Sequence, residues 1–457
     1  MGFTNFFRRY EKFWGICLCA FKVHIIHVGN MANKGTQGLL KSDVFAIKDI
    51  LKRNVVISVS TVDIDGVRRL KLPLYAILTP MVDIPYEKTD AYAKKLGYMR
   101  TDLKYKVLAA SGLVIMLFQA MLSAFSAVAV KIGFKAFFRH EVLNRLKDCD
   151  LVVSCSDENF KESASLFSPN LFWILAWWSM LFSRTWDVLI AKFLGKKVVL
   201  FPNSIGPFRT FIGRFLAKLA LNNCDYVLVR EPISFEIVNS LRIRSKKILT
   251  SDTSLLLPLV NSEVSDLPKP VVGVCLGIYS NILSEKEISR HILAYAKAID
   301  EAIGKYDFSV VFLPHYISGF RYDDFEISQL IICKLKNKNT VKCVNVHTVD
   351  EFKSLLGQMD MVISSKMHPA IYATSQYVPT LCIAYDQKQI GYFNRLGLDE
   401  CVISVREISY EKVLLKIGYV WNKREAIRSS LKRSIPSLET DVREAIKLVL
   451  DRSIGMR

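Results

Sequence analysis

The sequence predicts an α/β protein made of two doubly wound domains, each a parallel sheet covered by helices. Short apolar runs alternate with helix-like segments along most of the chain, as in sheets with crossover helices. A length of 457 residues favours two domains over a single core. The polar, proline-bearing segment SEVSDLPKP at 262–270 divides the alternation and indicates an interdomain linker. We therefore expect two Rossmann-like domains, 22–261 and 271–430, that face each other across a cleft.

The first domain is expected to begin with a strand, a glycine-punctuated turn, a helix and a second strand. Lys22 to Val28 is apolar enough for a buried strand, and Gly29 to Gly38 forms the turn. Apolar residues at helical spacing follow in LLKSDVFAIKDILKR, and 55–63 is the next strand. This order opens a doubly wound domain, although the turn lacks a GxGxxG dinucleotide fingerprint. Further strands are expected within 150–160, 196–208, 225–234 and 247–258.

The second half repeats the alternation and closes with charged helical segments from Ser409 to Arg452. We assign residues 431–457 to a separate C-terminal helix. Helices are expected around 286–304, 323–337 and 350–358. Strands are expected at 271–277, 309–315, 341–346, 361–364, 380–385 and 401–405.

A hydrophobic insert interrupts the first domain at about 107–140, with a second dense apolar run at 171–182. Residues 107–130 carry no charge and are long enough to cross the ~30 Å hydrocarbon core of a bilayer. A single crossing would put the first strands on the opposite side of the membrane from the rest of their sheet. We therefore expect a re-entrant or in-plane membrane helix, or a helical hairpin around Ser111–Gly112 or Gln119. A helix buried in the protein core is the alternative, but the basic flank KIGFKAFFRH favours membrane contact.

The formal net charge of +19 is spread along the chain and mixed with apolar runs. No C2H2, RRM or similar signature occurs, so no nucleic-acid partner is expected. The charge instead favours an anionic membrane surface and anionic substrates, with a basic surface kept for solubility as the alternative. Residues 1–21 mix Phe and Trp with Arg and Lys and lack a cleavage site, which indicates an uncleaved interfacial segment. These features predict a protein associated with the cytoplasmic face of the membrane.

Ten cysteines are scattered along the chain without CxxC spacing, and none forms a zinc pattern with histidine. Only Cys17 and Cys19 lie close together in sequence. We expect no metal site, and free thiols in a reducing cytoplasm fit this spacing best.

The segment MVISSKMHPAIYATSQYVPTLCIAYDQK at 361–388 carries the strongest chemical signal. Its pattern predicts strand, polar loop, helix and strand, with Ser365, Lys366 and His368 in the loop. In open parallel sheets, ligands bind outside the carboxyl ends of strands, where helix N-termini offer free N–H groups to anions. A lysine and a histidine at such a turn can neutralise an acidic group and move a proton.

Several motifs, taken in order, make the chain resemble the polysaccharide pyruvyl transferase family, whose members are similar to two-domain GT-B glycosyltransferases. The motifs cover residues 22–400 apart from the insert, and PNSIGPF and the SxKxH segment are the most specific pair. The matching pieces are GNMANKGTQGLL, SCSDENF, PNSIGPF, REPIS, SDTSLLL, SSKMHPAIYA and PTLCIAYDQK.

The resemblance implies an enzyme that transfers pyruvate from phosphoenolpyruvate to two sugar hydroxyls, forming a cyclic ketal and releasing phosphate. Phosphoenolpyruvate is then the donor substrate, and no cofactor is implied. The implied acceptor is a sugar of a surface polysaccharide or of a lipid-linked saccharide. Cationic side chains and helix N-termini must hold the carboxylate and phosphate, and an acid must protonate the enol carbon.

By the same resemblance, Lys366 and His368 fall where the family has an R-x-H pattern at the donor site. Lysine neutralises charge but cannot form the bidentate fork that arginine makes with a carboxylate. His368 is the candidate general acid or electrostatic clamp, because an unperturbed histidine titrates near neutrality. A helix-start histidine satisfied by the backbone is the alternative. Ser365 is expected to bind the donor beside Lys366.

Arg230 and Asp252 each follow a strand and complete the predicted donor side. Arg230 is expected to reach the donor carboxylate, with an ion pair to Glu231 or Glu236 as the alternative. Asp252 is expected to orient His368 or to act as base, with capping of the turn that follows as the alternative.

Four residues form the predicted acceptor side, in the first glycine-rich turn and in the loop after the strand near 150. Asn33 and Lys34 either bind sugar or shape their turn. Asp157 and Glu158 either contact sugar hydroxyls or form a solvated acidic loop.

Two other functions stay open from the sequence. A GT-B glycosyltransferase that uses a nucleotide sugar would explain Lys366, because lysine often meets a diphosphate as a point charge. A non-catalytic member that keeps the fold without the donor arginine is the third possibility.

Overall fold

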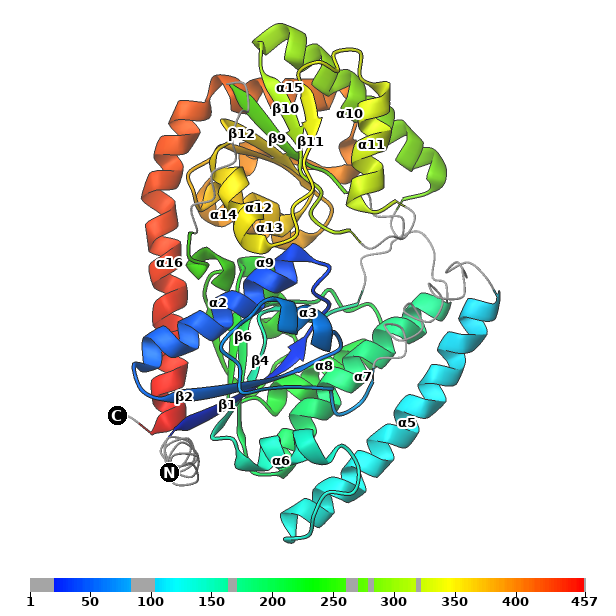
Figure 1. Cartoon of the computed structure of the whole chain (residues 1–457), viewed down its shortest axis with the longest axis vertical. Helices are drawn as coiled ribbons and strands as arrows, with labels where there is room; N and C mark the ends of the chain where they lie inside the picture. Colours follow the sequence, from blue (N-terminus) through cyan, green and yellow to red (C-terminus); the bar gives the residue numbers. More distant parts are fainter. Residues whose placement is uncertain are drawn as a thin grey trace, which may run out of the picture.

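The computed structural model describes residues 20–83, 103–162, 171–259, 270–277, 283–317 and 322–455. The interfacial segment expected at 1–21 lies outside the described residues except for its last two. The linker expected at 262–270 lies outside them except for Pro270. Figure 1 shows two stacked α/β domains, as the alternating sequence pattern predicts.

The first domain is built on a parallel sheet with the strand order β3-β2-β1-β4-β6-β7-β8, and β5 pairs with β6. Residues 150–160 were expected to form a strand that ends in a polar loop. The strand is present, but the expected loop contains a second short strand after a bend at Ser156. A short edge strand at Ala76–Leu78 had no clear sequence signal. The strands are β1 (Phe21–Val28), β2 (Val55–Thr61), β3 (Ala76–Leu78), β4 (Leu151–Ser154), β5 (Asp157–Phe160), β6 (Lys197–Ile205), β7 (Tyr226–Val229) and β8 (Lys246–Leu249).

The second domain has a parallel sheet in the order β11-β10-β9-β12-β13-β14. All six strands were expected from apolar runs and end at or a few residues before the expected ends. The strands are β9 (Val271–Cys275), β10 (Ser309–Phe312), β11 (Val341–Cys343), β12 (Met361–Ser364), β13 (Thr380–Ala384) and β14 (Val402–Ser404). In both sheets the order reverses beside the first strand of the domain, so the prediction of two doubly wound domains is confirmed.

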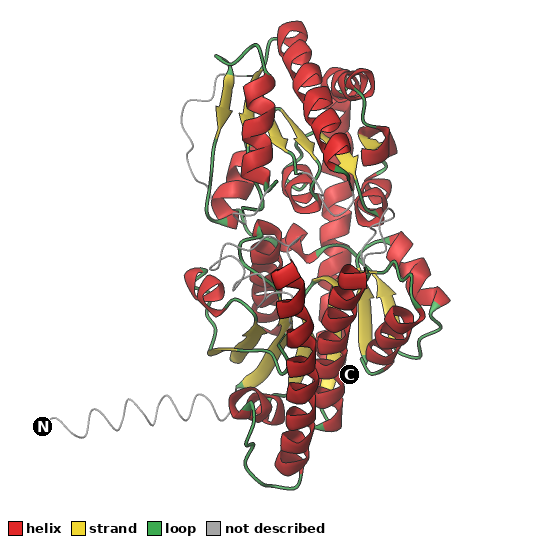
Figure 2. Cartoon of the chain, turned by 90° about the vertical axis from the view of Figure 1, so that its right-hand side faces the viewer, coloured by secondary structure: helices red, strands yellow, loops and turns green. Residues whose placement is uncertain are grey.

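Helices cover the sheet of each domain, as Figure 2 shows from the side of the molecule. In the first domain they are α2 (Lys34–Leu51), α3 (Ile64–Arg69), α5 (Leu103–Lys131), α6 (His140–Asp148), α7 (Leu171–Phe193), α8 (Phe211–Asn222), α9 (Pro232–Ser240) and the 3₁₀ turn η1 (Thr253–Leu256). In the second they are α10 (Glu285–Tyr306), α11 (Asp324–Lys334), α12 (Val349–Gly357), α13 (Met367–Thr374), α14 (Gln387–Leu396), α15 (Tyr410–Asn422), α16 (Arg424–Ile454) and the short turns η2 (Asp399–Cys401) and η3 (Val405–Glu407).

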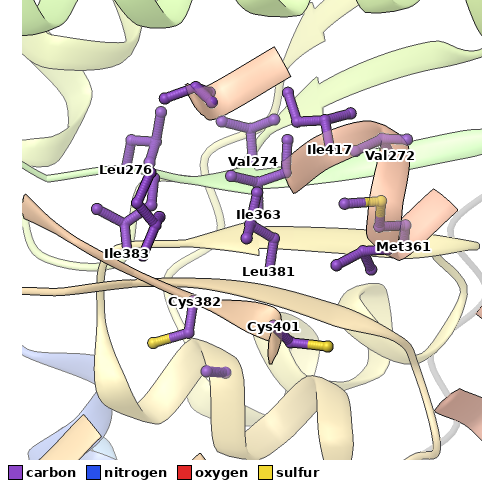
Figure 3. Packing of buried hydrophobic residues seen from close by; sticks show 14 of the residues in the cluster. Val272, Val274, Leu276, Met361, Ile363, Leu381, Cys382, Ile383, Cys401 and Ile417 are labelled. Carbon is purple, nitrogen blue, oxygen red and sulfur yellow. The ribbon is translucent and has the colours of Figure 1, made fainter. Parts of the chain in front are cut away.

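The second sheet is apolar on both faces, as expected when helices cover each side. Val274 on β9, Ile363 on β12 and Ile383 on β13 pack toward α15 through Ile417 (Figure 3). Cys382 lies on the opposite face of β13 from its neighbours, following the two-residue period of a strand. The cysteines of the described part of the chain are free thiols. Cys17 and Cys19 lie outside the described residues.

The last helix belongs to both domains rather than standing apart. α16 begins at Arg424, and Figure 1 shows it running along the side of both domains. Its first half contributes Leu431 and Ile435 to the core of the second domain. Its second half contributes Ile446 and Leu450 to the core around β1 and β2. The helix therefore fastens the end of the chain to the first domain.

The hydrophobic insert forms one continuous helix, α5, from Leu103 to Lys131. The hairpin alternative is wrong, because the helix runs unbroken through Ser111, Gly112 and Gln119. Gln119 does not mark a turn. Its side-chain amide donates a hydrogen bond of 2.8 Å to the carboxylate of Asp83.

The core-helix alternative also fails, because only a third of the most apolar window of α5 is buried. Within the described residues, Ala110–Lys131 is the helix long and apolar enough to cross a membrane. One face packs on the domain through Met116, Ala120 and Ala127. The opposite face exposes large apolar side chains, namely Val114, Leu117, Phe118, Met121, Phe125 and Val128.

The Trp-rich run at 171–182 forms the first half of α7, which packs against both α5 and α8. Trp186 ties α7 to α5 by donating a hydrogen bond of 2.8 Å to the Ser123 hydroxyl. Phe211 and Phe215 of α8 are also exposed. The first domain thus carries an apolar outer surface on α5 and α8, with α7 between them in the packing.

Candidate active site between the two domains

The two domains contact each other through elements that follow strand ends. Helices α2, α9 and the turn η1 of the first domain pack against α12, α13 and α14 of the second. Each of these elements begins soon after the carboxyl end of a parallel strand, where ligands bind in sheets of this kind. The predicted site residues therefore converge on one interdomain region.

Asn33 and Lys34 at the start of α2 hold the two domains together. The Asn33 side chain caps α2 by accepting a hydrogen bond of 2.8 Å from the Gly35 amide. Its backbone forms an antiparallel bridge to Tyr316. Lys34 donates through Nζ to the carbonyls of Pro314 and His315 at 3.2 and 3.3 Å, and burial lowers its pKa to about 8. Both residues thus shape the turn and the domain contact, and their binding to sugar stays a prediction.

Arg230 and Asp252 form a fully buried ion pair, with 2.7 Å between Nη1 and Oδ2. Arg230 Nε also donates to the Ser204 hydroxyl at 2.8 Å. Burial disfavours the charge on Arg230, but the carboxylates around it, Asp252 first, outweigh burial and raise its pKa. Arg230 Nη2 has no hydrogen-bond partner among the described residues. The alternative pairing with Glu231 is not seen, since the Glu231 carboxylate caps α9 at Ser234.

Asp252 also caps η1, so the alternative of capping the turn that follows is confirmed for this residue. Its Oδ1 accepts hydrogen bonds from the Ser254 amide at 2.8 Å and the Ser254 hydroxyl at 2.6 Å. Burial acts to raise the pKa of Asp252, but Arg230 and then His368 exert a stronger opposite effect, so the pKa is lowered. Asp252 is therefore a buried carboxylate whose charge acts on both Arg230 and His368.

His368 lies in the first turn of α13, against the start of α2. A methyl group on Gly35 would lie 2.2 Å from His368 Nδ1, so only glycine fits at this contact. The His315 ring stacks on His368, with centroids 6.3 Å apart. Nε2 of His368 is buried and has no hydrogen-bond partner within the described part of the chain. Burial lowers the His368 pKa to about 4, although Asp252 acts in the opposite direction.

The low pKa changes what His368 can do in the ligand-free protein. With a pKa of about 4, the imidazole of His368 is neutral near pH 7, and a neutral imidazole accepts a proton rather than donating one. The sequence analysis expected His368 to titrate near neutrality, and this does not hold unless a ligand raises the pKa. An anion bound beside the ring would favour the imidazolium and raise its pKa again.

Lys366 is the N-cap residue of α13, and its Nζ lies 3.0 Å from Asp324 Oδ1. Among the described residues, no side chain caps the start of this helix, which begins just after the carboxyl end of β12. Ser365 fixes the end of β9, because its hydroxyl accepts from the Gly277 amide at 2.8 Å and donates to the Gly277 carbonyl at 2.9 Å. These contacts position the loop, while donor binding by both residues stays a prediction.

Glu158 is half-buried and pairs with two buried lysines in a charge network that bridges the domains, rather than lying in a solvated loop. Its Oε2 accepts from Lys388 at 2.5 Å and lies 2.6 Å from Lys161 Nζ. Lys161 also lies 3.6 Å from Asp386. Burial acts to raise the pKa of Glu158, but Lys161 and Lys388 prevail and lower it. Burial and the charge of Glu158 raise the pKa of the neighbouring Asp157.

Lys388 and Lys161 were not among the candidates from the sequence. Lys388 stands just after the predicted strand TLCIAY, so its strand-end position was the signal that could have found it. Lys161 directly follows β5, which the sequence analysis took for a polar loop, so its position at a strand end was missed. No group of three or more His, Cys, Asp or Glu residues in the described ranges is arranged to hold a metal ion.

The model of the polysaccharide pyruvyl transferase family matches residues 43–387, which include Arg230, Asp252 and all of the 361–388 segment except Lys388. The chain belongs to the polysaccharide pyruvyl transferase family. Both halves of the interdomain region lie within this match, apart from Asn33, Lys34 and Gly35 at the start of α2 and Lys388 on α14.

Solved structures show which fold this family member has. A putative UDP-N-acetylglucosamine 2-epimerase from Listeria monocytogenes is similar with a TM-score of 0.62 and 10% identity, covering 96% of this chain and 98% of that one. The UDP-GlcNAc 2-epimerase from Neisseria meningitidis, bound to UDP-GlcNAc, gives 0.57 and 11%, covering 94% and 100%. A UDP-glucose:anthocyanidin 3-O-glucosyltransferase in complex with UDP gives 0.54 and 12%, covering 95% and 99%. These similarities confirm the GT-B-like fold of this family member and, at such low identity, nothing beyond the fold.

Proposed function

We propose that this chain is a ketal-forming pyruvyl transferase that uses phosphoenolpyruvate as donor. Its acceptor would be a sugar of a surface polysaccharide precursor or of a lipid-linked saccharide. The observation that carries the proposal is that Arg230 Nη2 and His368 Nε2, in the interdomain region of a family member, are buried without a hydrogen-bond partner among the described residues. Buried polar atoms without partners are rare and costly, so a ligand with oxygen atoms that satisfies both would be favoured.

The chemistry divides between these residues. Arg230, held by Asp252 and Ser204, would bind the donor carboxylate, because its guanidinium is fixed before the donor arrives. Lys366 and the uncapped start of α13 would hold the phosphate. The arriving anion would raise the pKa of His368, which then has a proton to give.

The reaction balances without electron transfer. Protonation of the enol carbon makes the methyl group and leaves an oxocarbenium-like centre at the neighbouring carbon. One sugar hydroxyl adds there, the bond to the phosphate oxygen breaks, and the second hydroxyl closes the ketal. Of the two hydroxyl protons, one ends on the methyl group through the enzyme and the other leaves with phosphate. Asp252, whose charge acts on His368, would favour the imidazolium during this transfer.

The apolar surface of α5 supports a further part of the proposal, association with the cytoplasmic face of the membrane. Phe118 is 55% and Phe125 61% exposed on the same face of a helix whose other face packs on the domain. Large exposed apolar patches mark interaction surfaces, and an amphipathic arrangement favours a helix lying in the membrane interface. Such a position would bring the enzyme to a lipid-borne acceptor.

Incubation with phosphoenolpyruvate and membrane lipid extracts tests the enzyme activity. We expect phosphate release together with a mass gain on a lipid-linked saccharide that matches a pyruvate ketal. The His368→Ala variant is the matched inactive control, and Arg244→Lys, at the surface of the same molecule, should keep wild-type rates. Absence of both phosphate and ketal from the wild-type reaction would refute the proposal.

Calorimetry with phosphoenolpyruvate and with nucleoside diphosphates separates the two enzyme classes. Binding of a nucleoside diphosphate without binding of phosphoenolpyruvate would favour a glycosyltransferase that uses a nucleotide sugar. If His368→Ala leaves the polysaccharide of the cell unchanged, the chain would instead be a non-catalytic family member.

A further inference from the structure

His315 is a buried histidine of the interdomain region with no assigned part in the proposed reaction. It follows the carboxyl end of β10, the edge of a parallel sheet at which ligands bind. The residue is 3% exposed, and neither Nδ1 nor Nε2 has a hydrogen-bond partner in the described chain. An imidazole buried with both nitrogens unsatisfied is costly unless a ligand bonds to it.

The position of His315 is fixed by contacts that leave both ring nitrogens unused. Its ring packs against Phe352 of α12, with centroids 5.4 Å apart, and stacks on His368 of α13 at 6.3 Å with an interplanar angle of 15°. Its carbonyl accepts a hydrogen bond of 3.3 Å from Lys34 Nζ of the first domain. Both domains therefore hold the residue in place, while the polar edge of the ring is left for a ligand.

The charges around His315 favour an anion as that ligand. Burial is the main cause that lowers the pKa of His315 well below its ordinary value. The charges of His368, Lys366, Lys34 and Lys388 act in the same direction. Lys34 donates to two carbonyls and forms no ion pair within the described ranges, so its charge is not balanced by a bonded carboxylate. A bound anion would offset these charges and satisfy the ring.

Solvent reaches the edge of this region, which gives a small anion a route to His315. The side chains of Lys366 and Glu158 are 15% and 27% exposed. Lys366 pairs with Asp324 and lies over the ring of Tyr316, the residue that follows His315, with Nζ 6.0 Å from the ring centroid. An anion that enters beside Lys366 meets positive charge first and the more deeply buried His315 next.

We propose that His315 is a further catalytic residue, which bonds to the phosphate group of the donor and supplies the proton with which phosphate leaves. The proposed reaction moves two protons, one to the enol carbon and one to the departing phosphate. The region holds two adjacent imidazoles, and His368 is assigned to the first of these transfers. The proton transfer by His315 rests on the proposed function, whereas its bond to phosphate does not.

The step balances in atoms and electrons. The charge of the bound phosphate raises the pKa of His315, so the ring takes up a proton from solvent. After the first sugar hydroxyl has added, the bond between carbon and the phosphate oxygen breaks, and both electrons stay on the oxygen. That oxygen takes the proton from His315 and leaves as hydrogen phosphate. The second sugar hydroxyl closes the ketal, and its proton restores the imidazolium.

Nitrogen NMR on the full-length protein, labelled with ¹⁵N in its seven histidines, tests the bond to phosphate. The signals missing from His315→Phe identify the ring of His315. At pH 7 we expect these signals at the positions of a neutral imidazole, and addition of inorganic phosphate should move them to those of an imidazolium. Signals of His315 that stay neutral when phosphate or phosphoenolpyruvate is added would overturn the proposal.

Calorimetry measures what the nitrogens contribute to affinity. His315→Phe keeps an aromatic ring beside Phe352 and should bind phosphoenolpyruvate and inorganic phosphate about tenfold or more weakly, the loss expected for one hydrogen bond to a charged group. Binding of pyruvate, which has the carboxylate without the phosphate, should be unchanged. His291→Phe is the matched control, because His291 is also buried with an unpartnered Nδ1 but lies on α10. Equal phosphate affinity in the wild type and His315→Phe would contradict the contact.

His315→Gln separates the bond to phosphate from the proton transfer, because an amide can donate a hydrogen bond but has no proton to give up. Its donor affinity should stay within a few-fold of the wild type, while its turnover falls about 100-fold or more. Wild-type turnover in this variant would refute the proton transfer. Circular dichroism checks that each variant is folded, and His315→Gln replaces His315→Phe in the NMR assignment if the latter is not. A phosphate-dependent shift of His315 without any transferase activity refutes the proposed function and the proton transfer that rests on it. Transferase activity without that shift refutes the role of His315 alone.

Discussion

At the residue scale, the interdomain region combines paired charges with a few unsatisfied nitrogens. Arg230 is paired with Asp252, Lys366 with Asp324, and Lys388 with Glu158. Such pairs fix side chains in place, since removing one partner leaves the other charge buried and uncompensated. Among the described residues, the buried nitrogens of this region without hydrogen-bond partners, which a ligand could bind, lie on Arg230, His368 and His315. The region is thus preorganised for an anion rather than built around free cations.

The buried, neutral His368 should make the folded protein sensitive to acid. Its pKa is about 4 in the folded chain against an ordinary value of 6.5, so the unfolded chain takes up a proton first as the pH falls. The free energy of unfolding therefore receives its full contribution from the neutral His368 above pH 6.5. It loses up to about 3 kcal/mol as the pH falls from 6.5 through 4.

Urea unfolding of the wild type and His368→Gln between pH 7.5 and 4.5 measures this effect. The wild type should lose stability more steeply than the variant over that interval. His347→Gln, an exposed histidine of the same domain, shows the effect of removing a histidine from the surface. Identical pH slopes for the wild type and His368→Gln would contradict the assignment.

At the element scale, the start of α2 and the start of α13 meet at van der Waals contact. Gly35 permits this approach, and Tyr372 of α13 also donates a hydrogen bond to the Lys34 carbonyl at 3.2 Å. Two helix starts held this close align the strand ends of the two domains. Any side chain at Gly35 must therefore displace His368 or separate the domains.

Gly35→Ala should accordingly reduce transferase activity strongly and destabilise the protein by about 1–3 kcal/mol, as overpacking does. Gly304→Ala is the matched control, because nothing lies within 4 Å of a methyl group there. In the interior of α10 this control should stabilise by about 0.5–1 kcal/mol. Thermal unfolding measures the stability of both variants, and phosphate release measures their activity. If Gly35→Ala is as stable and as active as Gly304→Ala, the α2–α13 contact is not tight.

The exposed face of α5 gives a second prediction at this scale. The triple variant Val114→Ser, Phe118→Ser, Phe125→Ser should lose most of its flotation with phosphatidylglycerol and phosphatidylethanolamine vesicles, because apolar area drives insertion into the interface. It should remain folded, since these side chains do not contribute to the core. A triple variant at the exposed Leu293, Leu415 and Leu448 controls for general loss of surface hydrophobicity. Unchanged flotation of the α5 variant would exclude this face as the membrane contact.

At the scale of the whole molecule, α16 couples the two domains. Residues near its start belong to the core of the second domain and residues near its end to the core of the first. Arg395 on α14 reinforces the link through an ion pair of 2.7 Å with Asp441 in the middle of α16. The second half of α16 therefore packs on the first domain, although it follows the second domain in sequence.

Ile446→Ala should destabilise the first domain by about 2–5 kcal/mol, the cost of a large cavity, although it lies beyond the second domain in sequence. Leu448→Ala, half-exposed on the same helix, should cost well under 1 kcal/mol. Hydrogen exchange should show the loss of protection for Ile446→Ala in β1 and β2. Loss confined to the second domain would mean that α16 does not fasten the first.

The sequence by itself determined the two doubly wound domains, the family and the segment around His368. Each of these follows from local patterns, since a buried parallel strand needs an apolar run and ligand-binding residues follow strand ends. The same local patterns indicated Arg230 and Asp252, but as separate candidates.

Only the tertiary structure decided which candidates touch. It paired Arg230 with Asp252, brought Lys388 to Glu158, and placed Gly35 against His368, contacts between residues far apart in the chain. It also made the apolar insert one helix with an exposed face and divided α16 between two cores. Such outcomes depend on which surfaces pack together and how deeply charges are buried, and neither is encoded in the spacing of residues along one segment.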